Sequence, residues 1–399
     1  MVERPKAASG GGMTSFLTRV YAFKLFDALI LIFPLYVVMF ADAGLTPIQI
    51  SACLIAWSAV NFVLQVPSGV IADRYSRRWI LAIAQLGRGA GFATWLLFPH
   101  FWGFLVGLLL WGLKSAFTSG TFEALLYDEL KARGATEAYT RVFGRARAVQ
   151  STGILLSALG AAAVAHYGYR PALLASAGSS VLAIAAALAL PRAPAQVMAA
   201  EMDYLSHLRQ GLAISFRDPV VLNILVFSSI VLALGAALEE FWPIFGAHVG
   251  LARPIIALFV GAQNAIEALV SLVAYRLSNL RPRGFYALFA FGGAVLLAAT
   301  AVFRPSAMIL LALYSGLMKM IAVVFEGRLQ HAIGSGQRAT IGSVKGFMAQ
   351  IGITGLYLGF GPAAQATSYR TAFMACGCVG IVIGLGYLAA PRQGRPIVS

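Results

Sequence analysis

The sequence has little charge. Asp, Glu, Lys and Arg make up only 11% of its 399 residues, whereas 59% of the residues are hydrophobic, and the mean hydropathy is +0.80. A soluble globular chain carries about 25% charged residues, so the composition excludes that class. Apolar stretches of roughly 18 or more residues recur, each long enough to cross a bilayer as a helix. The sequence therefore predicts an all-α polytopic membrane protein.

Cysteine and histidine are also scarce. The three cysteines cannot form a disulfide framework, and Cys376 and Cys378 would face different directions on a helix. The five histidines lie at the ends of apolar segments or in loops, at spacings that indicate no metal site. The sequence contains no nucleophile–base motif and no phosphate-binding loop. We therefore expect no enzymatic activity, no metal and no cofactor.

Acidic residues are few: 15 Asp and Glu stand against 30 Lys and Arg, which gives a net charge of +15. Such an excess can indicate a nucleic-acid partner. Here, however, most of the cations fall in the termini and in alternate loops, on one side of the predicted membrane, and cytoplasmic loops are the ones enriched in Lys and Arg. We therefore expect a protein of the cell's inner (cytoplasmic) membrane with both termini in the cytoplasm and no nucleic-acid partner.

The apolar stretches predict twelve membrane helices in two groups of six. The predicted spans lie near 15–41, 47–72, 79–98, 101–127, 140–166, 171–191, 219–248, 254–277, 284–303, 306–328, 339–365 and 370–391. The polar segment 192–218 predicts a cytoplasmic linker with a short amphipathic helix. It separates an N-terminal bundle, 15–191, from a C-terminal bundle, 219–391, and short cytoplasmic tails at 1–14 and 392–399 complete the chain.

The first span could also be a secretory signal peptide, because Ala41-Asp42-Ala43 resembles a cleavage site. The segment is too long for the apolar core of a signal peptide, contains Lys24 and Asp27, and has a counterpart later in the chain. We therefore interpret it as a membrane helix.

The two halves of the chain resemble each other in several short motifs. The matches are Tyr169-Arg170 with Tyr369-Arg370, Arg145 and Gln150 with Lys345 and Gln350, Phe122-Glu123 with Phe325-Glu326, and Phe33-Pro34 with Trp242-Pro243. Each match is weak alone, but together they predict parallel repeats of six helices.

A strongly basic turn connects the second and third predicted spans. Its pattern is Gly-x-x-x-Asp-Arg-x-x-Arg-Arg, formed by Gly69, Asp73, Arg74, Arg77 and Arg78. On charge alone it is a cytoplasmic loop that fixes topology. The spacing, however, resembles the loop signature of the major facilitator superfamily of secondary transporters. The one departure is Ser76, where that family usually has glycine.

The resemblance implies two pseudo-symmetric six-helix bundles and transport by alternating access. It also implies a conformational latch on the cytoplasmic side. Asp73 would face the N-terminus of the eleventh helix, where the helix dipole favours an anion, and Arg77 would pair with Asp128 at the end of the fourth helix. The alternative for Asp128 is a solvated carboxylate at a helix end.

Several charged residues fall inside the predicted spans, where one charge costs at least ~2.5–3.5 kcal/mol on insertion scales. Those that we expect to line a substrate cavity are Lys24, Asp27, Arg88, Lys114, Glu239, Lys319 and Glu326. By analogy with the family, helices 1, 4, 7 and 10 surround that cavity. The alternative is structural interhelical pairing, or a local Lys24–Asp27 pair.

Proton coupling needs a carboxylate whose proton affinity depends on burial and on neighbouring charges. Asp27 is the first candidate, followed by Glu267, Glu239 and Glu123.

The function that we predict is a secondary active transporter, coupled to protons, that moves a small organic solute and acts as a monomer in the lipid bilayer. The buried cations Arg88, Lys114 and Lys319 favour an anionic or zwitterionic solute. Export as an antiporter is modestly favoured over uptake, although the predicted fifth helix lacks the Gly-Pro pattern usual in drug antiporters. The alternative is a protein of the same fold that pumps no solute, such as a lipid flippase, a sensor or a scaffold.

Overall fold

The computed structural model describes residues 10–191, 218–333 and 338–390, and within these ranges all regular structure is helical. The predicted linker and its amphipathic helix lie outside the described residues, apart from Asp218. A few side chains within helices, including those of Gly69 and Asp73, are also outside the description.

The helices of the N-terminal half begin and end close to the predicted spans. They are α1 (Gly10–Ala28), α2 (Tyr36–Asp42), α3 (Pro47–Arg74), α4 (Arg77–Leu97), α5 (Phe101–Thr118), α6 (Thr121–Ala132), α7 (Tyr139–Val164) and α8 (Arg170–Leu188). Two predicted helices are interrupted. The first breaks between Ala28 and Tyr36, and the fourth breaks at Ser119 and Gly120, where Gly120 has φ +74°.

The C-terminal half follows the same sequence of elements. Its helices are α10 (Pro219–Glu239), α11 (Trp242–His248), α12 (Arg253–Val273), α13 (Pro282–Val302), α14 (Ala307–Ala332), α15 (Arg338–Ala366) and α16 (Tyr369–Ala389). The predicted seventh helix is thus also interrupted, but only at Glu240 and Phe241.

Ten helical segments among the described residues are long and apolar enough to cross a membrane, with α5 and α6 forming one of them. Helix α1 is not among the ten because it carries Arg19, Lys24 and Asp27. Helix α15 is 29 residues long but rich in glycine and glutamine. These two helices correspond to the first and eleventh predicted spans, so the structure agrees with a chain of twelve membrane helices.

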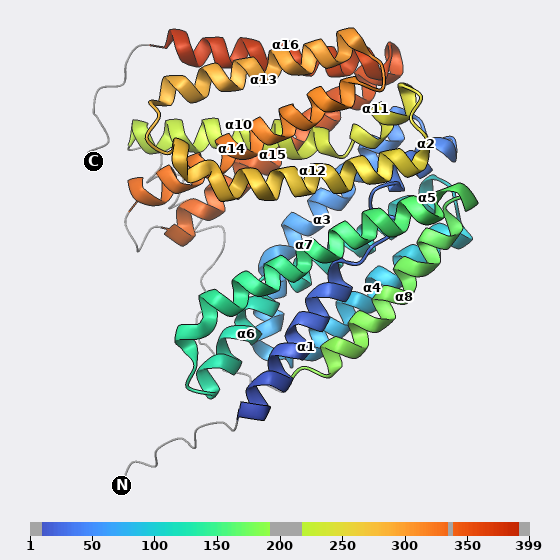
Figure 1. Cartoon of the computed structure of the whole chain (residues 1–399), viewed down its shortest axis with the longest axis vertical. Helices are drawn as coiled ribbons and strands as arrows, with labels where there is room; N and C mark the ends of the chain where they lie inside the picture. Colours follow the sequence, from blue (N-terminus) through green and yellow to red (C-terminus); the bar gives the residue numbers. More distant parts are fainter. Residues whose placement is uncertain (1–9, 192–217, 334–337, 391–399) are drawn as a thin grey trace. The chain divides into compact units, whose positions relative to one another are not determined.

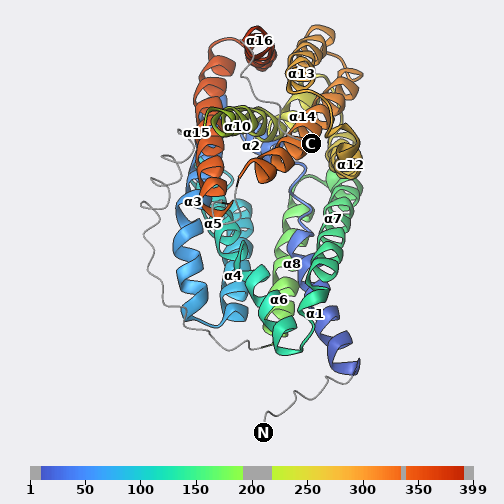
Figure 2. The same ribbon diagram turned by 90° about the vertical axis from the view of Figure 1, so that its left-hand side faces the viewer.

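The chain forms two compact units, which are described separately. The first comprises Met1–Leu45, Ala52–Ala200 and Ala252–Asn264, and the second comprises Thr46–Ser51, Glu201–Leu251 and Ala265–Ser399. In the first unit, α4 packs against α5 and α8, and α1 packs against α7 and α8. In the second, α13 packs against α14 and α16, and α10 packs against α14 and α15 (Figures 1 and 2). The pairs α4–α5, α4–α8 and α1–α7 therefore recur as α13–α14, α13–α16 and α10–α15, which supports the repeat.

The ends of α2 and α11 give the register of the repeat. Gly44 and Gly250 have φ of +88° and +87°, a conformation that glycine adopts at no steric cost after a helix. The next amides, of Leu45 and Leu251, donate to carbonyls five residues back, at 3.1 and 2.9 Å. This alignment sets Tyr36 against Trp242. The sequence-based match of the two prolines is therefore displaced by three residues.

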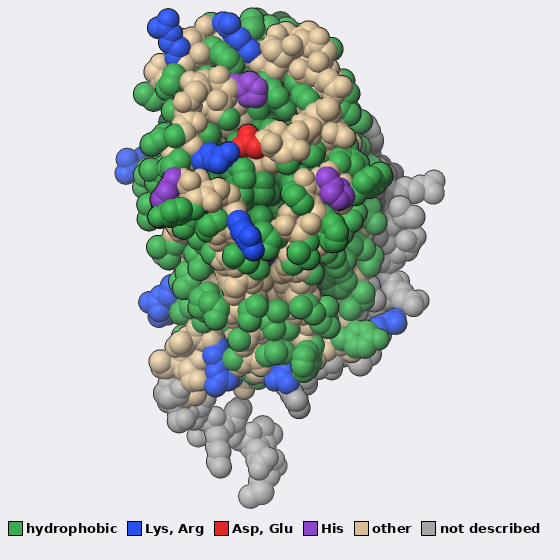
Figure 3. Space-filling view, turned by 90° about the vertical axis from the view of Figure 1, so that its right-hand side faces the viewer, with side chains coloured by type: hydrophobic (Ala, Val, Ile, Leu, Met, Phe, Trp, Pro, Cys, Tyr) green, Lys and Arg blue, Asp and Glu red, His purple; other side chains and the backbone are tan. Residues whose placement is uncertain are grey.

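Large apolar side chains cover much of the outer surface. Leu97, Leu272 and Ile309 are 69%, 71% and 73% exposed, and the face in Figure 3 is mainly hydrophobic with scattered charges. In a chain with this many apolar helices, such surfaces face lipid.

Candidate functional site

The first membrane span is broken because of Pro34. Proline lacks the N–H that would bond one turn back, and it clashes with that turn. Helix α1 ends at Ala28, and residues 29–35 form turns until α2 begins at Tyr36. In the second unit Pro243 lies inside the first turn of α11, where a missing N–H costs little. Only Glu240 and Phe241 separate α11 from α10, and both keep right-handed helical backbone angles.

Asp27, one residue before the end of α1, is the centre of a buried charge cluster in the first unit. Its Oδ1 atom lies 2.5 Å from the Lys114 ammonium and accepts a 2.5 Å hydrogen bond from the Gln85 amide. The Arg88 guanidinium is 3.8 Å from the same oxygen. All four side chains are nearly inaccessible, at 5%, 8%, 0% and 0% exposed for Asp27, Lys114, Gln85 and Arg88.

Among the described residues no direct ion pair joins Lys24 to Asp27, although the two charges attract each other. The carboxylate of Asp27 pairs with Lys114, whereas the Lys24 ammonium lies 4.1 Å from the centre of the Phe122 ring. Asp27 is thus one anion among three buried cations, Lys24, Arg88 and Lys114. The cluster carries excess positive charge, so it favours an anionic group nearby.

The second unit contains a cluster of the opposite sign. Lys319 Nζ lies 3.4 Å from Glu267 Oε2, and the carboxyl groups of Glu239 and Glu267 are within side-chain hydrogen-bonding reach of each other. Glu240 adds a further carboxylate beside Glu239. Three acids therefore accompany one cation, an arrangement that favours a proton or a cationic group.

Glu123 and Glu326 occupy related positions near the ends of the fourth and tenth membrane helices. Glu326 pairs with Lys345 and accepts a 2.9 Å bond from Gln330. Glu123 lies 3.7 Å from Arg147, on a largely exposed surface, and its Oε2 also accepts the Gly120 N–H at 3.1 Å. Glu123 therefore caps α6, a structural function that the sequence did not predict.

The basic turn is fastened to neighbouring helices. Arg77 forms an ion pair with Asp128, and Arg78 donates to the Leu188 carbonyl at the end of α8, at 3.4 Å. Arg74 is exposed. The predicted contact of Asp73 lies outside what the structure describes, and the latch function of Arg77 and Asp128 stays a prediction.

The second copy of this turn is held by a residue that the sequence did not single out. Arg328 of α14 donates to the carbonyls of Ser278, at 3.1 Å, and Leu280. Its guanidinium lies over the ring of Phe285, 4.7 Å from the ring centre. In the first unit the cations Arg77 and Arg78 begin the helix that follows the turn, whereas here the cation comes from α14. No feature of the sequence pointed to Arg328.

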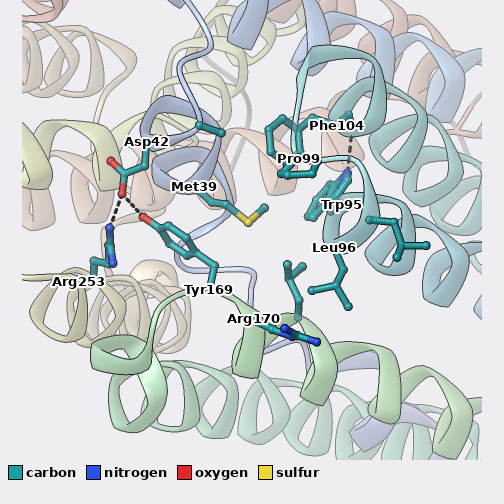
Figure 4. Close-up of a pocket in the computed structure, with 12 residues that line it drawn as sticks. Met39, Asp42, Trp95, Leu96, Pro99, Phe104, Tyr169, Arg170 and Arg253 are labelled. Carbon is teal, nitrogen blue, oxygen red and sulfur yellow. Dashed lines mark hydrogen bonds and ion pairs between the residues drawn. The ribbon is translucent and has the colours of Figure 1, made fainter.

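A cavity of about 590 Å³ lies at the end of the first unit opposite the basic turn (Figure 4). Trp95, Leu96 and Phe104 line its apolar side. At its rim, Asp42 accepts hydrogen bonds from Tyr169 and from Arg253, the latter at 2.8 Å. Burial, followed by the bond to Asp42, raises the pKa of Tyr169 well above its ordinary value of 10.0.

Broken first spans, intramembrane charges and two units with matching helix packing are features of a helical membrane carrier. Comparison with known proteins agrees. The family model of the Major Facilitator Superfamily matches residues 20–385, and the chain belongs to that family.

Among solved structures, the nucleoside transporter NupG is 15% identical, with 96% of this chain and 99% of that chain covered and a TM-score of 0.71. A D-xylose–proton symporter is 13% identical, with coverages of 94% and 96% and a TM-score of 0.69. A bacterial homologue of the human lysosomal transporter Spinster is 13% identical, with coverages of 96% and 97% and a TM-score of 0.73. At these identities the likeness concerns the fold alone. Among curated proteins no match is found.

Proposed function

We propose that the protein is a proton-coupled secondary transporter, working by alternating access, for a small organic solute that carries a carboxylate or is zwitterionic. The observation that carries this proposal is the opposite charge of the two clusters, of which the first is buried and the second is partly exposed, with Lys319 42% exposed. Asp27, Arg88 and Lys114 leave a positive excess in the first unit, and Glu239, Glu267 and Lys319 leave a negative excess in the second. A solute with both signs of charge has one group that complements the first cluster and one that complements the second.

A hydrogen-bond acceptor in the first cluster supports a polar solute. The Oε1 atom of Gln85 is buried and has no hydrogen-bond partner among the described residues. A buried acceptor of this kind normally binds a donor from solvent or ligand, so a solute hydroxyl or a water molecule is the donor that we expect at this place next to Asp27.

For the proton we favour Glu267 and Glu239 over Asp27. Asp27 is held by an ammonium and an amide and lies near a guanidinium, all of which stabilise its ionised form. Two carboxyl groups in hydrogen-bonding reach, by contrast, share a proton more easily than they both ionise. Binding of a cationic group near Lys319 and Glu267 would change that balance and couple the solute to the proton.

Export is the direction that we propose to test first, because the sequence analysis modestly favoured it over uptake. One of the compared folds belongs to a proton symporter, so the fold does not set the direction. We further propose that the basic turn and both termini face the cytoplasm, that the two six-helix bundles comprise 15–191 and 219–391, and that Arg77 and Asp128 belong to a latch on that side.

The test is transport by purified protein in liposomes that enclose a pH-sensitive dye. A panel of organic anions, amino acids and lipophilic cations is added with and without a pH gradient. We expect proton movement and uptake of label for an anion or zwitterion, lost in Lys114→Met and Lys319→Met but kept in Lys131→Met, whose side chain is exposed. If only lipophilic cations move, the proposed solute class is wrong. If no solute moves and fluorescent lipids are flipped, the lipid-flippase alternative replaces it.

A further inference from the structure

The end of α1 at the break needs partners for its backbone. The last carbonyls of a helix have no intrahelical donor, and a buried helix end must find one elsewhere. Arg88 supplies it: Nη1 donates to the Asp27 carbonyl at 2.5 Å and Nη2 donates to the Phe26 carbonyl at 3.2 Å. Its Nε donates to Ser180 Oγ at 3.0 Å. The guanidinium thus bonds to the α1 backbone and to α8, and it is 3.8 Å from the Asp27 carboxylate.

Two serines hold the non-helical segment that follows. Ser157 of α7 accepts the Ile30 N–H at 2.7 Å, and Ser176 of α8 accepts the Ile32 N–H at 3.0 Å. Both serines are buried, at 1% and 0% exposed. The unwound backbone is therefore satisfied by side chains from three helices.

The second unit provides an internal control. In the register given by Gly44 and Gly250, residues 29–33 correspond to 235–239, which are still helical in α10. Aligned by the ends of α4 and α13, Arg88 falls on Gly293. Aligned by the sequence repeat, the serines at 157, 176 and 180 fall on Tyr357, Cys376 and Gly380.

Gly293 and Gly380 stand where the first unit has Arg88 and Ser180, and they leave little room for a side chain. A Cβ added to Gly293 would lie 2.8 Å from the Gly377 carbonyl oxygen, and one added to Gly380 would lie 3.4 Å from Gly293 Cα. Where the helix continues, the two backbones approach closely and no capping side chain fits. Where the helix is broken, an arginine and three serines are present.

We propose that Arg88 is a positioning residue: it caps the end of α1, keeps the first membrane span broken at residues 29–35, and thereby fixes Asp27 against Lys114. The guanidinium of Arg88 is fully buried and bonded, so it does not contact solute. The substrate-cavity function that the sequence predicted for Arg88 stays a prediction, and the two functions differ in whether Arg88 contacts the solute.

Hydrogen–deuterium exchange of the full chain in lipid nanodiscs tests the cap. In Arg88→Met, the amides of residues 29–33 and of Leu35 should exchange at least about tenfold faster, because a charge-assisted bond to the backbone is lost. Arg88→Lys, which keeps one donor and the charge, should be intermediate. The double variant Asp27→Asn/Lys114→Met removes the carboxylate but not the capped carbonyls, and should stay within about twofold of the wild type.

Equal exchange in Arg88→Met and in the double variant would overturn the proposal, because Arg88 would then act only as a counter-ion of Asp27. Unchanged exchange in Arg88→Met would overturn it as well. If Arg88→Met does not fold, Arg88→Lys and Ser176→Ala take its place. The latter removes the acceptor of the Ile32 N–H and should accelerate that amide at least about tenfold.

A second readout separates positioning from general stability. A double-variant cycle measures the coupling between Asp27 and Lys114 as a ratio of unfolding equilibrium constants. In the Arg88→Lys background this ratio should fall at least about tenfold. A residue that only filled space would lower the unfolding temperature and leave this coupling unchanged.

Discussion

Replacing Asp27 by Asn should leave two buried cations without their anion. Asp27 and Lys114 are only 5% and 8% exposed, and the carboxylate oxygen lies 2.5 Å from the ammonium. Breaking a buried pair by removing one partner costs about 3–5 kcal/mol, mostly because the remaining charge stays buried. Asparagine keeps an acceptor for Lys114, so we expect the lower end of this range, about 3 kcal/mol.

Removing the lysine as well should restore most of this loss. Replacing a buried ion pair by apolar groups of similar volume is often neutral or stabilising. We therefore expect Asp27→Asn/Lys114→Met to lie within about 1 kcal/mol of the wild type, which is a coupling of at least about 2 kcal/mol in the cycle. Arg88 stays behind in both variants and is satisfied by backbone carbonyls and Ser180.

The assay is reversible unfolding of the purified protein in mixed micelles, followed by tryptophan fluorescence. The matched control is the exposed pair Glu123 and Arg147, at 3.7 Å with side chains 36% and 58% exposed, whose coupling should stay below about 1 kcal/mol. Additive effects of Asp27→Asn and Lys114→Met would refute the reasoning, because the two side chains would then not be an isolated pair in a medium of low polarity.

Three further predictions concern other parts of the molecule. Gly153→Ala in α7 should destabilise the protein by about 1–3 kcal/mol, because the new Cβ would lie 2.9 Å from both Ala28 Cβ and the Leu25 carbonyl oxygen. In the control Gly144→Ala, in the same helix, the new Cβ meets nothing within 4 Å, so this variant should be neutral or stabilising. Equal unfolding temperatures of the two variants would contradict this prediction. In the folded protein Tyr169 keeps its proton above pH 10.0, where the unfolded chain loses it, so the free energy of unfolding should decline as the pH rises beyond that value. Tyr169→Phe should weaken this decline between about pH 9 and about pH 11. An identical pH profile of the variant and the wild type would exclude Tyr169 as the source of the decline. Glu267→Gln should abolish proton-driven accumulation in liposomes while solute exchange persists, with exposed Glu137→Gln as control; accumulation at the wild-type level would remove Glu267 from the coupling mechanism.

The membrane helices could be predicted closely because apolar runs in a membrane protein are both long and bounded by polar turns. The third and ninth predicted spans, 79–98 and 284–303, differ from α4 and α13 by two residues or fewer at each end. The breaks could not be predicted in the same way. Residues 29–33 are as apolar as any helix interior. Pro34 indicates a break nearby, but only the contacts with Arg88, Ser157 and Ser176 show how far back the helix ends.

The charged candidates show the same limit. The sequence identified Asp27, Arg88 and Lys114 as costly in a membrane, but it could not pair them, because Asp27 and Lys114 come from different helices and are 87 positions apart. It also treated Arg88 as a residue of the cavity. A buried arginine can satisfy a helix end as well as a ligand, and the choice depends on where a neighbouring helix stops, which is a tertiary feature.

The two halves share their helix packing but differ in their buried polar residues, and the different positions of their prolines explain this difference. Pro34 lies two residues before α2, whereas Pro243 lies inside α11, so the first copy has the longer non-helical segment within its span. An uncapped carbonyl there costs several kcal/mol, and an arginine at position 88 therefore becomes necessary in one copy and impossible in the other, where Gly293 meets the Gly377 backbone. The positive excess of the first unit follows in part from this structural need. The rest of that excess comes from Lys114 and Lys24, which together outnumber the single anion Asp27. Variants of these two lysines, rather than of Arg88, should change which solutes are bound.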